Sequence, residues 1–440
     1  MKMPRIPRWL QNIGLGIAII VLLALWIALP WQGVALVVIG LVIWLITTRG
    51  GRLAWMATRL GISSLPQRWG ASLVIVVGIA GVVGVLVAML AMGEGFSATL
   101  KGTGSDRNAI LLRGGAQAET NSVITRDQAV LMQSLPGIAR DGEGRPLASP
   151  ELSQVVTLPS KSDGSDANAQ IRGVTAAGWT VRPRVRVVEG RRFEPGKREL
   201  TVGSGVVSQF RGVSVGNTLT FANQDWEVVG VFRSGDSHDS ELWADADTLA
   251  ATYQRSAYQS VTVRLEGKGS LKTLKAALDE DPRLKLDAET TRQYYNKQAS
   301  GLKKLIDVLG TVIGAIMAVG AVFGALNSMY AAVAGRAREI ATLRALGFRG
   351  MPVVVGVMLE TMTLALIGGV LGGLLAWLIF NNYSVSTLGS NFSQVVFAFK
   401  VSPALLWSGL KWALGIGLIG GLLPALRAAR MPVTDALRAI

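Results

Sequence analysis

The sequence predicts an α-helical polytopic membrane protein with about six transmembrane helices and a mixed α/β extracytoplasmic domain inserted between the third and fourth helices. Half of the 440 residues are hydrophobic and only 17% are charged, which is more apolar material than a soluble core of this size needs. Apolar runs long enough to span a bilayer occur towards both ends of the chain. The roughly 200 residues between them have an ordinary globular composition.

Residues 1–48 are predicted to form an N-terminal helical hairpin of two extra transmembrane segments. A basic start, MKMPRIPR, precedes an apolar run at 13–29, as in a secretory signal. No small-residue cleavage site closes this run, and a second apolar run follows at 34–46. A retained hairpin is therefore favoured over a cleaved leader, although the second run is short for a bilayer that requires about 20 residues.

Residues 49–94 are predicted to contain an interfacial helix followed by the third span. Leu53, Met56 and Leu60 fall on one helical face between arginines, a pattern typical of an amphipathic helix that lies in the membrane interface. The stretch 71–92 then carries no charge. It is long enough to cross the bilayer.

Residues 95–302 are predicted to form the extracytoplasmic α/β domain, because strand-like and helix-like stretches alternate along them. Thr125 and Gln128 make a capping box, and the stretch 218–232 predicts two strands around a turn. A final helix is expected to begin near Thr291 and to continue into the next span without a break. Such continuity would couple the domain mechanically to the membrane.

Residues 303–440 are predicted to form a C-terminal membrane domain with three further spans. These lie at about 305–334, 353–380 and 405–426, with a polar loop at 381–402. Glycine pairs four residues apart occur in all three spans and allow helix backbones to approach closely. Basic flanks place both termini in the cytoplasm and the large domain outside, by the positive-inside rule.

The composition excludes several functional classes. The chain has no cysteine, which removes disulfides and thiolate metal sites. No P-loop pattern occurs, so the chain is not expected to hydrolyse ATP itself. A net charge of +15 does not predict nucleic-acid binding, because the arginines flank hydrophobic spans and are not interleaved with aromatic residues. No catalytic residue and no metal site are predicted.

One acidic cluster comes nearest to a metal site. Asp236, His238, Asp239 and Glu241 lie close together in a predicted loop. One histidine with flexible carboxylates matches no recognisable ligand spacing. A solvated acidic loop is therefore favoured over a cation site.

Two polar residues are candidates for intramembrane roles. Glu360 lies about two turns into the fifth predicted span, where a carboxylate is costly and is by default a functional candidate. Pairing with a basic residue of the nearby cytoplasmic segment is the favoured interpretation, and a proton or substrate role is the alternative. Asn327, in the fourth predicted span, is the second candidate.

The segment 335–350, GRAREIATLRALGFRG, is predicted to be a short amphipathic helix at the membrane surface. Ile340, Leu343 and Leu346 recur at helical spacing and form one apolar edge among arginines. Gly347 can supply the left-handed residue that ends such a helix. A loop that only orients the chain in the membrane needs basic charges alone. A surface that binds in a groove on a cytoplasmic partner needs both the basic charges and the apolar edge.

The stretch 327–350, NSMYAAVAGRAREIATLRALGFRG, resembles the signature of the MacB/FtsX family of ABC transporter permeases. The likeness extends to RLAWMATRL at 52–60, to MGEGF at 92–96 and to PALRAARMPVTDALR near the end of the chain. The resemblance implies that 335–350 is the coupling helix that docks on a separate ATP-binding subunit. The residues implied to form the docking surface are Arg336, Arg338, Glu339, Ile340, Leu343, Arg344, Leu346 and Gly347.

The same resemblance implies the setting in which the chain works. A homodimer of permeases would lie in the bacterial inner (plasma) membrane, with its large domain, divided into two subdomains, in the periplasm. ATP and Mg would be bound by the partner subunit, with no cofactor in this chain. A periplasmic membrane-fusion adaptor is a further expected partner, beside the lipid bilayer.

The predicted function is that of a permease subunit which couples ATP hydrolysis in another chain to motion of the periplasmic domain, for export or efflux by mechanotransmission. One alternative is an FtsX-like signal transmitter that activates a periplasmic enzyme. Another is a proton-coupled transporter that uses Glu360. The absence of internal repeats and the single intramembrane acid disfavour the last alternative.

Overall fold

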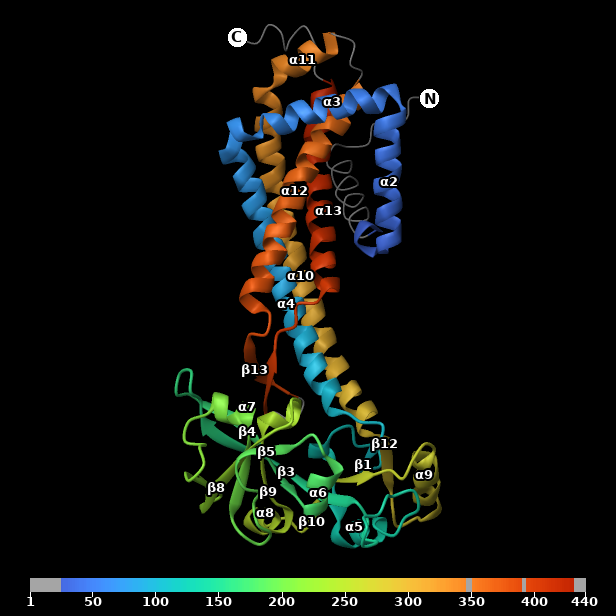
Figure 1. Cartoon of the computed structure of the whole chain (residues 1–440), viewed down its shortest axis with the longest axis vertical. Helices are drawn as coiled ribbons and strands as arrows, with labels where there is room; N and C mark the ends of the chain where they lie inside the picture. The colour runs from blue at the N-terminus through green and yellow to red at the C-terminus, as the bar shows by residue number, and fades with distance from the viewer. Residues whose placement is uncertain (1–24, 346–349, 390–392, 431–440) are drawn as a thin grey trace, which may run out of the picture. The chain divides into compact units, whose positions relative to one another are not determined.

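The computed structural model describes residues 25–345, 350–389 and 393–430. Contacts within the chain divide it into two compact units, whose helices and strands are labelled in Figure 1. The membrane unit comprises Met1–Ala91, Asp307–Asn381 and Lys400–Ile440. The α/β unit comprises Met92–Ile306 and Asn382–Phe399.

Four helices of the described residues are long and apolar enough to cross a membrane. They are α4 (Trp69–Thr103), α10 (Thr291–Gly335), α12 (Gly350–Phe380) and α13 (Pro403–Arg430). The second predicted span forms α2 (Trp31–Thr47), which is only 17 residues long. Most of the first predicted span lies outside the described residues. The membrane-type helices are confirmed, whereas the predicted total of six is not.

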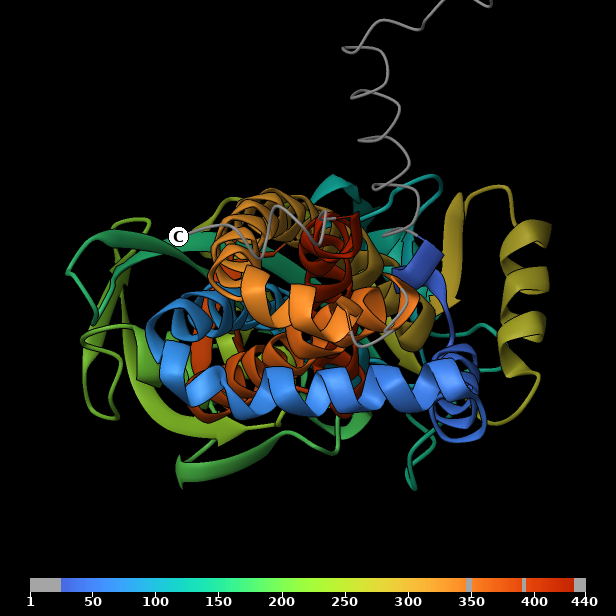
Figure 2. The ribbon, with the colours of Figure 1, turned by 90° about the horizontal axis from the view of Figure 1, so that it is seen from above.

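Helix α3 (Arg49–Ser63) follows α2 after a bend of 100°. The side chain of Thr48 begins the helix by accepting a hydrogen bond from the backbone N–H of Gly51. Figures 1 and 2 show α3 lying across the other helices of the membrane unit rather than along them. Its buried positions are small residues, namely Gly51, Ala54, Thr58 and Gly61. This helix is the predicted amphipathic helix of 49–67.

Glycine pairs set the spacing of the helices in the membrane unit. A Cβ atom on Gly372 of α12 would lie 2.4 Å from the backbone oxygen of Ala80 in α4. A Cβ atom on Gly417 of α13 would lie 2.5 Å from the Cβ of Ala365 in α12. The predicted role of these pairs in close packing is confirmed here. By contrast, Gly320 and Gly324 of α10 face no described atom within 4 Å.

The α/β unit is built on a mixed ten-stranded sheet with the order β12-β1-β11-β3-β4-β9-β6-β8-β5 and with β7 paired to β8. The pairs β4–β9 and β6–β8 are parallel, and the other ladders are antiparallel. The strands of this sheet are β1 (Asn108–Arg113), β3 (Ala148–Pro159), β4 (Asp166–Val174), β5 (Arg186–Gly190), β6 (Glu199–Gly203), β7 (Thr218–Phe221), β8 (Gln224–Arg233), β9 (Glu241–Asp245), β11 (Ser260–Arg264) and β12 (Leu286–Thr290).

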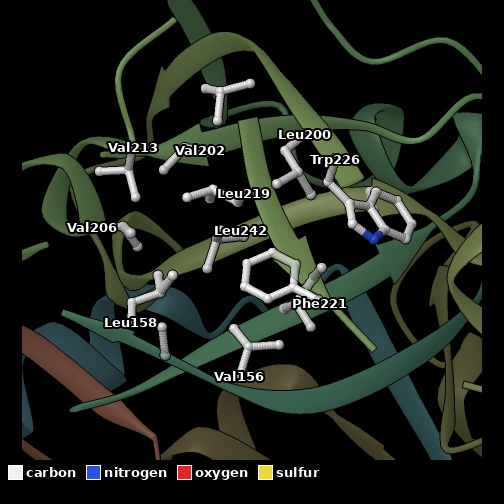
Figure 3. Packing of buried hydrophobic residues seen from close by; sticks show 14 of the residues in the cluster. Val156, Leu158, Leu200, Val202, Val206, Val213, Leu219, Phe221, Trp226 and Leu242 are labelled. Atoms are coloured by element: carbon white, nitrogen blue, oxygen red, sulfur yellow. The ribbon is translucent and has the colours of Figure 1, made fainter. Parts of the chain in front are cut away.

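Four clusters of buried hydrophobic residues pack in this unit, and two of them are the largest. Figure 3 shows the larger one, in which Trp226, Phe221 and Leu242 pack between the strands β3, β4 and β6 to β9. The second core lies around β1, β11 and β12 and includes Leu274 and Leu278. The short helices of the unit are α5 (Arg126–Met132), α6 (Ala176–Val181), α7 (Ser204–Gln209), α8 (Ala246–Thr252) and α9 (Ser270–Glu280). Two short strands, β2 (Ile124–Thr125) and β10 (Ala257–Tyr258), pair with each other outside the main sheet.

Local predictions for this unit are confirmed in two places. Thr125 and Gln128 form the expected capping box at the start of α5. Strands β7 and β8 form the expected hairpin, with Ala222 and Asn223 at positive φ in the turn. Each element therefore follows from short-range chemistry.

The expected polar loop at 381–402 is instead a β-hairpin. Its strands β13 (Ser384–Leu388) and β14 (Gln394–Ala398) pair with each other, and the backbone N–H of Val396 donates to Ser240 Oγ at 2.8 Å. The prediction was wrong because the polar composition hid two short strands whose apolar side chains pack on the α/β unit, with the Phe397 ring edge-on to Phe96.

Two helices continue without a break through residues that belong to both units. Helix α4 runs from Trp69 to Thr103, and α10 runs over 45 residues from Thr291 to Gly335. The predicted continuity of the helix that begins near Thr291 is therefore confirmed. Each helix therefore has residues in both units.

Candidate functional site

The candidate functional site is an ion cluster around Glu360 in the membrane unit. Glu360 lies on α12, and only 3% of its surface is exposed. Its Oε1 accepts a hydrogen bond from Arg68 Nη2 at 3.0 Å, and its Oε2 accepts one from Arg336 Nη1 at 3.1 Å. Both carboxylate oxygens are thus occupied by guanidinium donors, which favours the ion-pair interpretation of Glu360 over a proton-carrying one.

The first partner, Arg68, comes from the end of the interfacial segment. It is the last residue of the short 3₁₀ helix η1 (Leu65–Arg68), which joins α3 to α4. Its Nη2 also donates to Ser64 Oγ at 2.8 Å, which orients the guanidinium. The cluster therefore connects α12 with the segment between α3 and α4.

The second partner, Arg336, stands at the junction of α10 and α11 (Ala337–Ala345). Besides Glu360, it binds Glu339 through Nε at 2.9 Å. Its backbone carbonyl accepts from the N–H of Ile340, so its main chain begins the first turn of α11. Arg336 thus ties the start of α11 to a buried carboxylate of α12.

A glycine allows α3 to approach this cluster. A Cβ atom on Gly61 would lie 2.5 Å from Glu360 Oε2. Further along the same contact, a Cβ atom on Gly356 of α12 would lie 3.0 Å from the Cβ of Ala57. A larger side chain at Gly61 would require Glu360 Oε2 to shift.

The predicted docking residues fall into three groups. Arg338 and Glu339 are exposed on α11 and Arg344 is half-buried. Ile340 is only 5% exposed and packs within the chain, so it holds α11 in place and does not project from the surface. Leu346 and Gly347 lie outside the described residues, as does the side chain of Leu343.

The structure does not bring Asn327 to this cluster. Asn327 lies on α10 and is exposed. The two intramembrane polar candidates therefore belong to different surroundings, one buried and one on the helix surface.

A second buried ion cluster, missed from the sequence, lies at the middle of the sheet in the α/β unit. Arg172 of β4 is 2% exposed and donates to three glutamates. The bonds run from Nη1 to Glu119 at 2.8 Å and to Glu151 at 3.0 Å, and from Nε to Glu241 at 3.0 Å. Arg182 donates to Glu151 at 2.6 Å and extends the cluster. These groups hold together β3, β4, β9 and the 3₁₀ helix η2 (Glu119–Asn121).

The predicted solvated acidic loop belongs to this cluster, and the prediction was wrong. Asp236, His238 and Glu241 are buried, at 6%, 4% and 5% exposure. His238 Nδ1 lies 2.8 Å from Asp236 Oδ1, and its Nε2 accepts from Arg182 Nε at 3.1 Å. Within the described residues, no three possible metal ligands lie together. These side chains are therefore engaged in ion pairing inside the fold.

Comparison with known proteins covers most of the chain. Residues 72–281 match the family described as "MacB-like periplasmic core domain", and residues 311–433 match the "FtsX-like permease C-terminal" family. The chain belongs to the MacB/FtsX-like family of ABC transporter permeases. Glu360 and the whole of α11 lie inside the second matched region.

Curated relatives match most of the chain at low identity. The chain is 24% identical over 415 residues to "Uncharacterized ABC transporter permease YknZ" of Bacillus subtilis, covering 86% of this chain and 98% of that protein. It is 24% identical over 391 residues to "Macrolide export ATP-binding/permease protein MacB" of Vibrio parahaemolyticus, covering 82% of this chain and 56% of that protein. The chain thus spans nearly all of YknZ and about half the length of the MacB relative.

Among solved structures, the periplasmic region of MacB from Actinobacillus actinomycetemcomitans aligns with 45% of this chain at 14% identity, with a TM-score of 0.35. The extracellular domain of YknZ aligns with 42% at 16% identity, with a TM-score of 0.32. The family assignment comes from the sequence matches.

The family membership gives the plain outline of the molecule. The chain is a membrane protein with several apolar helices, and its α/β unit is of the MacB-like periplasmic kind. Two of the site residues could be predicted from the sequence. The family resemblance implied Arg336, and the energetic cost of a carboxylate inside an apolar span implied Glu360. Arg68 carried only a weak signal, a basic residue just before an apolar run.

The buried cluster predicts an acid-sensitive α/β unit. Burial by itself raises the pKa of Glu119, but the charge and hydrogen bonds of Arg172 outweigh it and lower the pKa to about 2, from 4.5. Because the folded pKa is the lower one, stabilisation is complete above about pH 4.5 and is lost as the pH falls towards 2. We expect a loss of about 3 kcal/mol in the free energy of unfolding over this range, measured by near-UV circular dichroism of the full chain in detergent.

The variant Glu119→Gln is the control for this prediction. It removes the titrating group, so its stability is expected to be lower near neutral pH and to change less between pH 4.5 and 2. Parallel pH profiles for the parent and the variant would contradict the assignment.

Proposed function

We propose that this chain is the permease subunit of an ATP-driven transporter, in which a separate nucleotide-binding subunit docks on α11 and moves the α/β unit. The observation that carries the proposal is the bond between Arg336 and Glu360 at the base of α11. It ties α11 to α12, and Arg68 ties the same carboxylate to the segment after α3. A push on α11 would therefore move three elements together.

The length of α10 supports transmission of that push. This helix ends at Gly335, next to Arg336, and runs without a break from Thr291 in the α/β unit. A continuous helix transmits displacement along its axis because its backbone hydrogen bonds resist stretching. We infer that force enters at α11 and reaches the α/β unit through α10.

The docking surface we propose is the exposed side of α11. Arg338 and Glu339 are exposed, Arg344 on the same helix is half-buried, and the buried Ile340 seats the helix. Leu343, Leu346 and Gly347, which the family resemblance also implies, would complete this surface. We propose that ATP and Mg are bound by the partner subunit. The MacB relative is named as an ATP-binding protein and permease in one chain, and this chain covers 56% of it. The same chain covers 98% of YknZ, which is named as a permease alone.

The proposed orientation follows from charge. Arg338, Arg344 and the arginines of α3 would lie in the cytoplasm with both termini, and the α/β unit would lie in the periplasm. The word "periplasmic" in the matched family description agrees with this placement.

A homodimer is proposed from one face of α10. Ile316, Val319 and Phe323 are 68%, 56% and 67% exposed, and the adjacent Gly320 and Gly324 face open space. The amide of Asn327 is exposed on the same helix, where lipid offers no hydrogen-bond partner. A second copy of α10 would cover the apolar stripe, approach the glycines and meet the amide.

We further propose export as the outcome, because the MacB relatives are named for macrolide export. A periplasmic membrane-fusion adaptor would then receive the moving α/β unit. The cargo would be moved by this motion, that is, by mechanotransmission, and the chain itself would have no catalytic role.

Charge reversal on α11 tests the docking surface. Arg344→Glu is expected to reduce partner-stimulated ATP turnover at least about tenfold in the reconstituted complex, since a reversed charge at an interface costs more than one lost contact. Arg59→Glu, an equally drastic change at an exposed arginine of α3, is the matched control and should leave turnover unchanged. Equal losses in both variants, or normal turnover in Arg344→Glu, would remove the docking assignment.

Single cysteines test the homodimer. The natural chain has no cysteine, so Phe323→Cys places one thiol on the proposed α10 face. A short bifunctional thiol reagent is expected to give covalent dimers in membranes. Val370→Cys on α12, also exposed at 54% in the natural chain, should stay monomeric. Dimers with Val370→Cys but not with Phe323→Cys would place the interface elsewhere.

A further inference from the structure

The α/β unit contains a small cleft of about 200 Å³ whose wall is rich in arginine. It lies where the last turn of α4, the start of α10 and the segment after α6 come together with β1 and β11. The arginines that line it are Arg107, Arg182, Arg184, Arg264 and Arg292. Five guanidinium groups around one small space need a source of negative charge.

Among the described residues, two of these arginines have a carboxylate partner. Arg182 is held by Glu151 at 2.6 Å, and Arg292 is held by Asp106 at 2.7 Å. Their charges are balanced within the fold.

The other three arginines have no acid bonded to them among the described residues. Arg184 donates to the backbone carbonyl of Gly102 at 2.9 Å, and Arg264 donates to the amide oxygen of Asn108 at 3.2 Å. Both acceptors are neutral, and each guanidinium retains further N–H donors. The side chain of Arg107 is exposed at the cleft. Roughly three positive charges are therefore uncompensated.

The one acid on the cleft wall does not neutralise them. Asp236 Oδ1 accepts from the backbone N–H of His238, contacts the His238 ring and accepts from Ser234 Oγ at 2.7 Å. The hydrogen bonds of this carboxylate are thus made to Ser234 and His238, and none is made to the three arginines among the described residues.

The cluster does not arise from a generally basic unit. Between residues 92 and 306 there are 28 basic and 25 acidic residues, so the background is close to neutral. Some arginines elsewhere in this unit meet carboxylates, as in Arg191 with Glu199 at 2.6 Å and Arg283 with Asp281 at 2.6 Å. What distinguishes the cleft is that several arginines line one small space.

We propose that this cleft binds a small soluble anion that carries phosphate or carboxylate groups. Guanidinium presents paired N–H donors that match the oxygens of both groups. The volume lies below the 300 Å³ or so at which pockets for drug-sized ligands begin, which excludes a bulky cargo. This inference goes beyond the proposed permease function, because it assigns a ligand to the α/β unit.

The position of the cleft suggests what binding does. Thr291, the first residue of α10, donates through Oγ1 to the carbonyl of Ser105 at 3.0 Å and accepts from the N–H of Ser105 at 2.9 Å. The end of α4 and the start of α10 are thus already joined beside the cleft. An anion bound to Arg184 and Arg264 would add a bridge between this junction and the sheet, and would rigidify the two helices that enter the membrane unit.

Titration calorimetry of the full chain in detergent tests the site, with inorganic phosphate and citrate as probes at constant ionic strength set by chloride. We expect saturable binding of at least one probe. Arg107→Gln/Arg184→Gln should weaken it at least about tenfold, because it removes two guanidinium groups that would make charge-assisted hydrogen bonds to the anion. Both side chains are exposed, so the variant should remain folded, which near-UV circular dichroism would verify.

The matched control is Arg186→Gln/Arg255→Gln. It removes the same charge from two exposed arginines of the same unit that do not line the cleft. Its affinity should equal that of the parent. The proposal is overturned if neither probe binds saturably, or if the two double variants lose affinity equally, since general charge and not the cleft would then explain the binding.

Discussion

The structure of the membrane unit depends on one buried carboxylate. An ionised Glu360 inside an apolar span is unfavourable unless its charge is compensated, and removal of one partner from such a pair costs about 3–5 kcal/mol. Arg68 and Arg336 supply the compensation at 3.0 and 3.1 Å from opposite directions in the chain. Because all three groups must meet, α12, the segment after α3 and the start of α11 have little freedom to move separately.

The two units use arginine differently. In the buried cluster of the sheet, Arg172 meets three glutamates, and a fully satisfied network of this kind specifies one arrangement of β3, β4 and β9. At the cleft, Arg184 and Arg264 meet only neutral oxygens. The arginine charge of the buried cluster is balanced by glutamates that hold the strands together. The arginine charge at the cleft would be balanced by the proposed anion.

Much of the architecture could be predicted because its signals are local. Apolar length located the spans α4, α10, α12 and α13, and helical spacing located α11. Pairing of Glu360 with the basic segment was also predictable, since Arg336 is 24 residues away. Arg68 is 292 residues away, and no local pattern reports a contact of that separation.

The failures have the same physical origin. Asp236 and His238 carry ordinary loop composition, yet long-range pairing with Arg182 buries them. Ile340 was expected at a docking edge, and tertiary packing instead buries it within the chain.

The central claim is that Glu360 and Arg336 act as one unit in coupling. The test is a double-mutant cycle in which partner-stimulated ATP turnover is measured. If the two residues act as one unit, Arg336→Gln/Glu360→Gln should have the same turnover as the more impaired of the two single variants. If the fold-losses of the two single variants multiply in the double variant, the two residues act independently and the account is contradicted.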